Sequence, residues 1–141
     1  MNLEPYIAVT GEGPLFKLVI SRANGLVLES LQDGKTKFYS TRKHQFTPLG
    51  TVAVYTLEGT TPLADVMQSM YDKYTDTPPV APKSEKHVIE EYFETILPEY
   101  DEDRVPLKDM KKIIKWYRFL HEKGLTEPSK EGESGRGEEE E

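Results

Sequence analysis

The chain has 141 residues, with 18 Lys or Arg against 25 Asp or Glu, and its formal net charge is −7. This length suits one compact domain or two very small ones, and the lack of cysteine excludes disulfides, thiolate metal sites and cysteine nucleophiles. No apolar run approaches the roughly 18 residues that span a membrane, and the first residues lack the basic start of a secretory signal, so we expect a soluble cytoplasmic protein.

Residues 1–58 contain short apolar runs separated by turn signals, which is typical of antiparallel strands. Asn24-Gly25 and Asp33-Gly34 are hairpin signals, because these residue types tolerate a positive φ. The pattern predicts five strands, at 6–9, 15–20, 26–31, 36–39 and 51–57. Five short antiparallel strands often close into a barrel, so the sequence favours an α+β protein with a small SH3-like barrel; a curved open sheet covered by helices is the alternative.

The second predicted hairpin allows a prediction about its two faces. If Asp33-Gly34 is a two-residue loop, Glu29 lies opposite Phe38. Neither face of this hairpin is then purely polar, so we expect cover on both sides, from the barrel core on one and from helices on the other.

The second half of the chain predicts helices. Thr61-Pro62 begins a helix over 61–75, because Thr is a good N-cap and Pro fits the first helical position. Residues 76–83 form a proline-rich linker. Two helices over 84–125 form an antiparallel hairpin that starts at Ser84 and ends at Gly124. Residues 126–141 carry no apolar side chain and are expected to be a disordered acidic tail.

Two groups of residues carry a resemblance to a known family. They include Leu15-Phe16-Lys17-Leu18, Ala53-Val54-Tyr55-Thr56, Asp101-x-Asp103-Arg104-Val105 and Lys111-Lys112-Ile113-x-x-Trp116-Tyr117. Over residues 6–121 the chain resembles a family of short, uncharacterised Bacteroidetes proteins with a domain of unknown function. The resemblance implies a bacterial cytoplasmic protein with a β N-terminal half and a helical C-terminal half, and it implies no activity.

The last predicted helix has a basic face. Its members are Lys108, Lys111, Lys112, Lys115 and Arg118. One interpretation is a phosphate-binding face for RNA, with Trp116 or Phe119 available for stacking. The alternative is a solvated face whose charges pair with Glu90, Glu91 and Glu94 of the neighbouring helix, or with the acidic tail.

A second basic and aromatic group lies around the fourth predicted strand. It comprises Lys35, Lys37, Tyr39, Arg42 and Lys43. Small barrels bind oligonucleotides or peptides through such a strand face. The alternative places Phe38 in the core and gives the basic residues the role of protecting an edge strand from aggregation.

Catalytic and metal-binding patterns find little support. The three histidines are scattered, and the acidic loop after Tyr100 fails the calcium-loop pattern at three positions, so we expect no catalytic residue, metal or cofactor. The sequence therefore favours a non-catalytic binding or adaptor protein of the bacterial cytoplasm that docks on a protein or ribonucleoprotein partner. The alternative is a direct RNA-binding protein that uses the lysines of the last helix and the basic strand.

Overall fold

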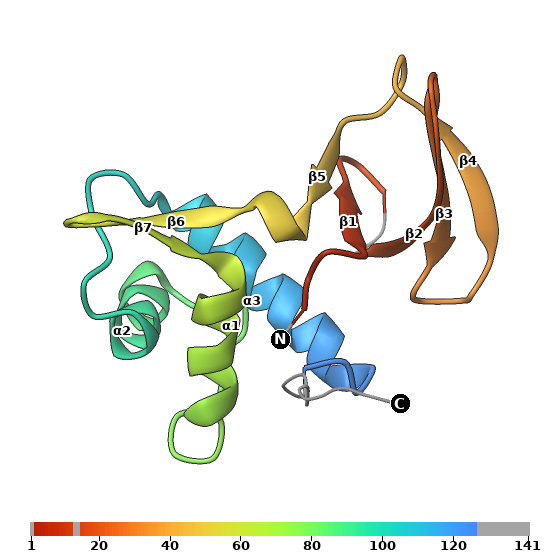
Figure 1. Ribbon diagram of the computed structural model, residues 1–141. Helices are drawn as coiled ribbons and strands as arrows, with labels where there is room; N and C mark the ends of the chain where they lie inside the picture. Colours follow the sequence, from red (N-terminus) through yellow and green to blue (C-terminus); the bar gives the residue numbers. More distant parts are fainter. Residues whose placement is uncertain (1, 13–14, 127–141) are drawn as a thin grey trace, which may run out of the picture.

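The computed structural model describes residues 2–12 and 15–126, which form a five-stranded sheet, a separate hairpin and three helices (Figure 1). The strands are β1 (Tyr6–Val9), β2 (Phe16–Arg22), β3 (Gly25–Ser30), β4 (Thr36–Ser40), β5 (Phe46–Pro48), β6 (Ala53–Thr56) and β7 (Gly59–Pro62). The helices are α1 (Leu63–Asp72), α2 (Lys86–Ile96) and α3 (Leu107–Glu122), and a 3-10 turn, η1 (Leu49–Thr51), follows β5.

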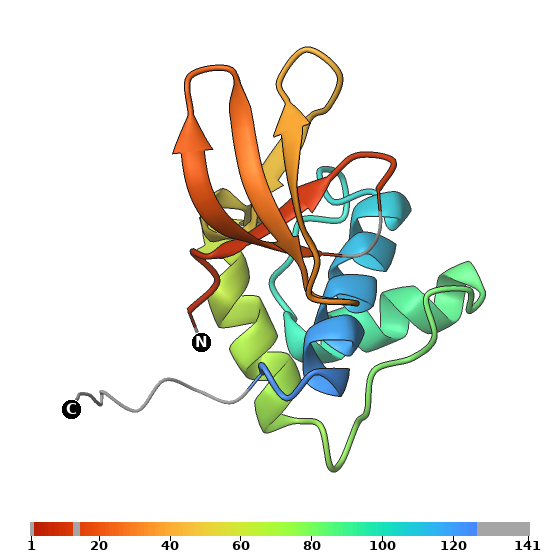
Figure 2. The ribbon, with the colours of Figure 1, turned by 90° about the vertical axis from the view of Figure 1, so that its right-hand side faces the viewer.

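The main sheet is antiparallel, with the strand order β4-β3-β2-β1-β5, while β6 and β7 pair only with each other. The predicted α+β class and the antiparallel sheet are confirmed. The predicted closed barrel is not found, because β4 and β5 stand at the two ends of the sheet and do not pair in the described part of the chain. The sheet is curved and has helices beside it, as the alternative prediction had it (Figure 2).

The strand predicted at 51–57 is present as β6, but it does not join the five-stranded sheet, whose fifth strand is β5. Pro48 has no N–H to continue the ladder, and η1 then turns the chain away from the sheet. The apolar residues after η1 form β6, which pairs with β7 instead. Since β7 occupies 59–62, the first helix begins at Leu63 and not at Thr61.

The first hairpin forms, but its loop lies one residue earlier than predicted. Arg22 pairs with Gly25, so the loop is Ala23-Asn24 and Gly25 belongs to β3. Gly25 is needed for another reason than its turn geometry: a Cβ there would overlap the carbonyl oxygen of Tyr39 and the ring of Phe38 on β4.

The second hairpin has a longer loop than predicted. Glu29 pairs with Thr36 and not with Phe38, and the Ser30 N–H donates to the Lys35 carbonyl, which leaves a loop over 31–34. Gly34 lies in that loop with φ of 76°. Because the register differs from the prediction by two residues, each side chain keeps its predicted face.

The two faces of the sheet have different cover. The inner face holds a small core of its own, made of Ile7, Val9, Phe16, Leu28 and Tyr39. On the outer face, Tyr6, Ala8 and Leu31 pack against the helical core. Toward the other end of β2 and β4, Ile20 and Phe38 are exposed. The prediction that both faces are covered is therefore confirmed at the end of the sheet near Tyr6, Ala8 and Leu31, and it fails at the end near Ile20 and Phe38.

The helices bury the faces that their periodicity predicts, and α3 ends as predicted. Gly124 has φ of 72°, its N–H donates to the His121 carbonyl at 3.0 Å, and the Leu125 N–H donates to the Leu120 carbonyl at 2.9 Å. This is the Schellman arrangement that glycine favours. The start of α2 differs: Glu85 is its N-cap, where the sequence favoured Ser84, and no side chain caps it.

One large apolar core joins the two halves of the chain. It contains the buried faces of all three helices together with Leu3, Leu15 and Leu49 from the N-terminal half. Residues 76–83, the predicted linker, contain no helix or strand, and the Arg118 guanidinium donates to the Pro79 carbonyl at 3.2 Å. None of the helices in the described part of the chain is long and apolar enough to cross a membrane.

Candidate functional site

Five basic residues lie along the solvent-facing side of α3. The buried side of the helix consists of Met110, Ile113, Ile114, Tyr117 and Leu120. The helical repeat therefore places the cations on the opposite side, where Lys108, Lys112, Lys115 and Arg118 are exposed and Lys111 is half-exposed. These five residues, called the α3 basic face below, are those predicted from the sequence.

The predicted pairing of this face with α2 is not found. Within residues 2–12 and 15–126 the ion pairs are His44 with Glu12, His87 with Glu85, and Arg104 with Asp101. The glutamates of α2 line a separate acidic groove of about 240 Å³, together with His87, Pro98, Tyr100 and Glu102. The α2 glutamates therefore line a different surface from the α3 basic face. The predicted contact with the acidic tail lies outside the described residues.

The acidic loop between α2 and α3 is attached to β6. The Leu57 N–H donates to the Glu99 carbonyl at 2.9 Å, and the Asp101 N–H donates to the Tyr55 carbonyl at 3.0 Å. The Asp101 carboxylate accepts the Asp103 N–H at 2.9 Å and lies 3.7 Å from Arg104 Nε. These carboxylates therefore shape a tight turn, which places Arg104 with its guanidinium carbon 5.3 Å from the centroid of the Tyr55 ring.

A cleft of about 210 Å³ lies where this loop, β6 and α3 meet. Its floor is apolar and consists of Val52, Val54, Val105 and Ile113. The half-buried Trp116 and Thr47 of β5 also line it. Trp116 therefore lies at the junction of the two halves of the chain.

Charged residues surround the mouth of this cleft. Arg104 and Lys112 are exposed cations, and Asp109 is a half-exposed anion. An apolar floor beneath two cations suits the side chain of a partner that carries both an apolar part and a negative charge, or an unstacked base beside a phosphate. Lys112 belongs to both the cleft and the α3 basic face, so the two features form one surface.

The second predicted patch has four exposed basic residues and one buried tyrosine. Lys35, Lys37, Arg42 and Lys43 are exposed, as a binding surface requires. Tyr39 is only 7% exposed and packs edge to face against Phe16 and His44, so it belongs to the sheet core, and its prediction as a binding residue is corrected. The exposed aromatic residue of β4 is Phe38, which the alternative prediction had placed in the core.

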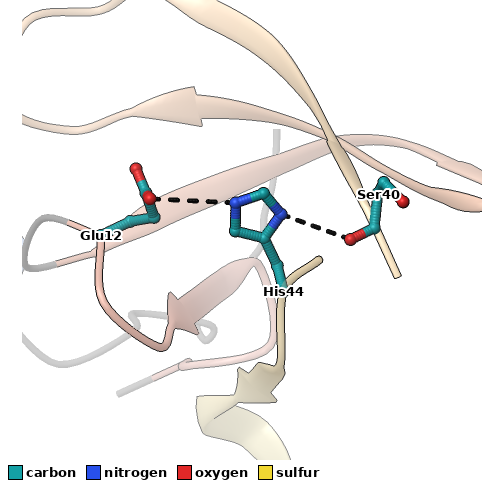
Figure 3. A network of polar contacts seen from close by, with 3 residues as sticks. All are labelled: Glu12, Ser40 and His44. Atoms are coloured by element: carbon teal, nitrogen blue, oxygen red, sulfur yellow. Dashed lines mark hydrogen bonds and ion pairs between the residues drawn. The ribbon is translucent and has the colours of Figure 1, made fainter. Parts of the chain in front are cut away.

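A small polar network holds the turn after β4 in place (Figure 3). His44 Nδ1 lies 3.3 Å from the Ser40 carbonyl oxygen, and His44 Nε2 lies 3.8 Å from Glu12 Oε2. The ring also stacks on Phe46, with 6.5 Å between centroids. His44 therefore ties the turn that carries Arg42 and Lys43 to the loop after β1.

One tyrosine of α2 and one of α3 are buried in the main core. The hydroxyl groups of Tyr92 and Tyr117 are buried and have no hydrogen-bond partner in the described part of the chain. Burial raises the pKa of Tyr92 well above its usual range, with a smaller contribution from Tyr117. Both rings lie in the main core, so we assign them to packing and not to the site.

Sequence reasoning found the α3 basic face but missed the cleft. Tyr55 and Arg104 are 49 positions apart, and the backbone pairing of Thr56 with Tyr100 that brings them together leaves no local signal. The resemblance had included both residues in its motifs without giving either a role.

Comparisons with known proteins give relatives but no activity. Residues 3–49 match the Domain of unknown function (DUF5606), and residues 52–120 match the Domain of unknown function (DUF6852). No protein with a curated description matches the chain. A structural-genomics target from Bacteroides vulgatus, solved by solution NMR, is similar, with 26% identity and a TM-score of 0.70 over 98% of this chain and 99% of that chain.

Proposed function

We propose a function from the surface of this chain, whose two halves match two domains of unknown function. The protein is a non-catalytic adaptor that docks a protein or ribonucleoprotein partner on the α3 basic face. The observation that carries this proposal is that the five cations of this face pair with no carboxylate of the described residues and adjoin an apolar cleft.

The cations and the cleft contribute to binding in different ways. A cationic rim attracts an acidic partner and sets its orientation, whereas affinity comes mainly from side chains that are buried at the centre of an interface. The cleft beside Trp116 offers such a centre, and Lys112 connects it to the rim. A partner with an acidic surface and one protruding apolar side chain would bind the cationic rim and fill the cleft.

We also propose a cellular location and a fold relationship for the protein. We assign it to the bacterial cytoplasm, because a chain without cysteine needs no oxidising compartment. We also regard its main sheet as an opened relative of the SH3-like barrel, since β4 and β5 end the sheet as the two strands that closure would join. The role is binding and not catalysis, in line with the chemistry of the surface residues.

Direct RNA binding is the second candidate. It is favoured by one observation, the presence of Tyr55 and Trp116 within a cleft that also contains Arg104 and Lys112. Aromatic rings stack on unpaired bases, and neighbouring cations neutralise the phosphates between them.

The test compares two pairs of charge reversals in the full chain. Lys112→Glu with Lys115→Glu changes the α3 basic face, whereas Lys83→Glu with Lys86→Glu changes exposed lysines elsewhere by the same net charge. The wild-type chain captures partners from a bacterial extract with and without ribonuclease, and each partner is then purified and its Kd is measured against all three proteins.

We expect the purified partner to bind the α3 variant about tenfold or more weakly and the control variant normally. Equal binding of both variants, or no saturable partner for the wild type, contradicts the adaptor proposal. Fluorescence anisotropy with a mixed-sequence single-stranded RNA, at about 50 and 200 mM salt, tests the second candidate. Tight binding that falls steeply with salt and is lost in the α3 variant favours RNA as the partner.

A further inference from the structure

An exposed apolar row runs across β2, β3 and the edge strand β4, and no helix or strand of the described residues covers it. Ile20 of β2 pairs with Val27 of β3, and Val27 pairs with Phe38 of β4, so the three side chains lie side by side on the outer face. Ile20 is 47% exposed and Phe38 is 40% exposed. Figure 1 shows β4 as the strand farthest from the helices, which cover only the other end of this face.

The backbone of β4 has a free edge next to this row. The bonds from Ser30 N–H to the Lys35 carbonyl and from Thr41 N–H to the Asn24 carbonyl fix which residues point toward β3. Because the bonds of an antiparallel ladder alternate, Lys37 and Tyr39 also bond toward β3, while Thr36 and Phe38 direct their N–H and C=O groups outward. Neither has another backbone hydrogen bond within the described residues.

The free edge of β4 is short because the backbone carbonyl at its C-terminal end already accepts hydrogen bonds. The Ser40 carbonyl accepts the N–H groups of Lys43 and His44 in the turn after β4. The edge therefore offers a ligand the two residues Thr36 and Phe38, enough to bind one extended segment in register but too short to template a long strand.

The surrounding charge indicates the chemistry of that segment. From β2 to the turn after β4 the acidic residues are Glu29 and Asp33, and the basic residues are Lys17, Arg22, Lys35, Lys37, Arg42 and Lys43. Lys37 lies on the inner face, 5.4 Å above the Tyr39 ring, and Phe38 lies on the outer face. A strand added beside β4 would thus meet a cation on one face and an apolar row on the other.

We infer that β4 is a docking edge for an extended acidic peptide in which acidic and apolar residues alternate. The peptide adds a strand beside β4, bonds to the outward groups of Thr36 and Phe38, places an apolar side chain next to Phe38, and sets its carboxylates near Lys37. This surface is separate from the α3 basic face, so the inference does not rest on the function proposed above.

The probe is a fluorescent synthetic peptide in which Glu and Val alternate, with a Lys–Val peptide of the same length as its control. Binding to the full chain is measured by anisotropy, and the bound site is mapped by NMR amide shifts and hydrogen exchange. Phe38→Ser shortens the apolar row, and Thr36→Pro removes an outward N–H that β3 does not use, which an edge strand tolerates. Leu57→Ser is the matched control, because Leu57 is an exposed apolar residue of the other hairpin.

We expect the Glu–Val peptide to bind and to slow exchange of the Thr36 and Phe38 amides. Phe38→Ser should weaken binding by about tenfold and Thr36→Pro by about fivefold, while Leu57→Ser has no effect. Equal binding of the Lys–Val peptide, or unchanged exchange at both amides, overturns the inference. So do shifts confined to α3, which would instead place the peptide on the α3 basic face. Concentration-dependent protection of β4 without peptide would also overturn it, by showing a second copy at this edge.

Discussion

The guanidinium carbon of Arg104 lies 5.3 Å from the centroid of the Tyr55 ring, across the edge of the cleft. Tyr55 reaches this place on β6, and Arg104 reaches it from the loop after α2, so the contact joins segments that are distant in the sequence. The ring offers its electron-rich face to the cation, and Asp101 Oδ2 lies 3.7 Å from Nε of the same guanidinium group. The mouth of the cleft is therefore built by long-range contacts and keeps a cation exposed.

The single tryptophan makes the electrostatics of the cleft measurable. Trp116 is half-buried beside Lys112, so an anionic quencher should concentrate near it. We expect iodide to quench the native fluorescence more strongly than caesium does, and Lys112→Glu to reverse that order. Lys83→Glu serves as the control. Equal quenching by both ions in the wild type would contradict a positive local potential.

The turn that carries Arg104 should depend on one carboxylate. Asp101→Ala removes the acceptor of the Asp103 N–H and the partner of Arg104, so we expect the free energy of unfolding to fall by about 1–2 kcal/mol. Asp103→Ala keeps both contacts and should cost less than about 0.5 kcal/mol. Chemical denaturation of the two variants measures this difference, and equal losses would contradict the role given to Asp101.

The helices and most strands could be predicted because their signals are local. The apolar stripe of α3 repeats every three or four residues, and Gly124 marks its end. The strand Phe46–Pro48 could not be found in this way, since three residues that include a proline show no alternation. Its place in the sheet comes from pairing with β1, far away in the sequence.

In the candidate site, too, local sequence patterns predict some residues, and only long-range pairing assigns the others. The cations of α3 could be predicted as a group because one helix carries them all. Tyr39 and Phe38 were harder, because adjacent strand residues point to opposite faces and the sequence does not say which face is inside. Only the register of β3 with β4, together with burial, assigns Tyr39 to the core and Phe38 to the surface.

Gly25 should be one of the least replaceable residues of the sheet. A Cβ at this position would overlap the Tyr39 carbonyl oxygen, which belongs to the neighbouring backbone and has little freedom to move. We expect Gly25→Ala to lower the free energy of unfolding by about 2–3 kcal/mol. Gly50→Ala is a graded comparison, because its Cβ would lie 3.2 Å from Glu4 Cα, and it should cost less. Thermal and denaturant unfolding measure both, and equal effects would contradict the close approach of β4 to Gly25.

Tyr92 should make the stability of the fold sensitive to alkaline pH. Its buried hydroxyl has no partner, and burial raises its pKa in the folded state above the ordinary value of 10.0. The unfolded chain therefore loses this proton at a lower pH than the folded chain does, so the folded state binds more protons above pH 10. The free energy of unfolding then falls as pH rises above about 10, and it is unaffected by this group below that value.

Tyr92→Phe removes both the unpaired hydroxyl and this source of pH dependence. We expect the variant to be as stable as the wild type near pH 7, or more stable by about 1 kcal/mol, because no hydrogen bond is lost. Between about pH 10 and 11.5 its free energy of unfolding should fall less steeply than that of the wild type. Tyr55→Phe, which removes a hydroxyl from a 46% exposed residue, is the control and should keep the wild-type slope. A loss of more than about 2 kcal/mol in Tyr92→Phe near pH 7 would show that the hydroxyl has a partner after all, since only a bonded group costs that much to remove.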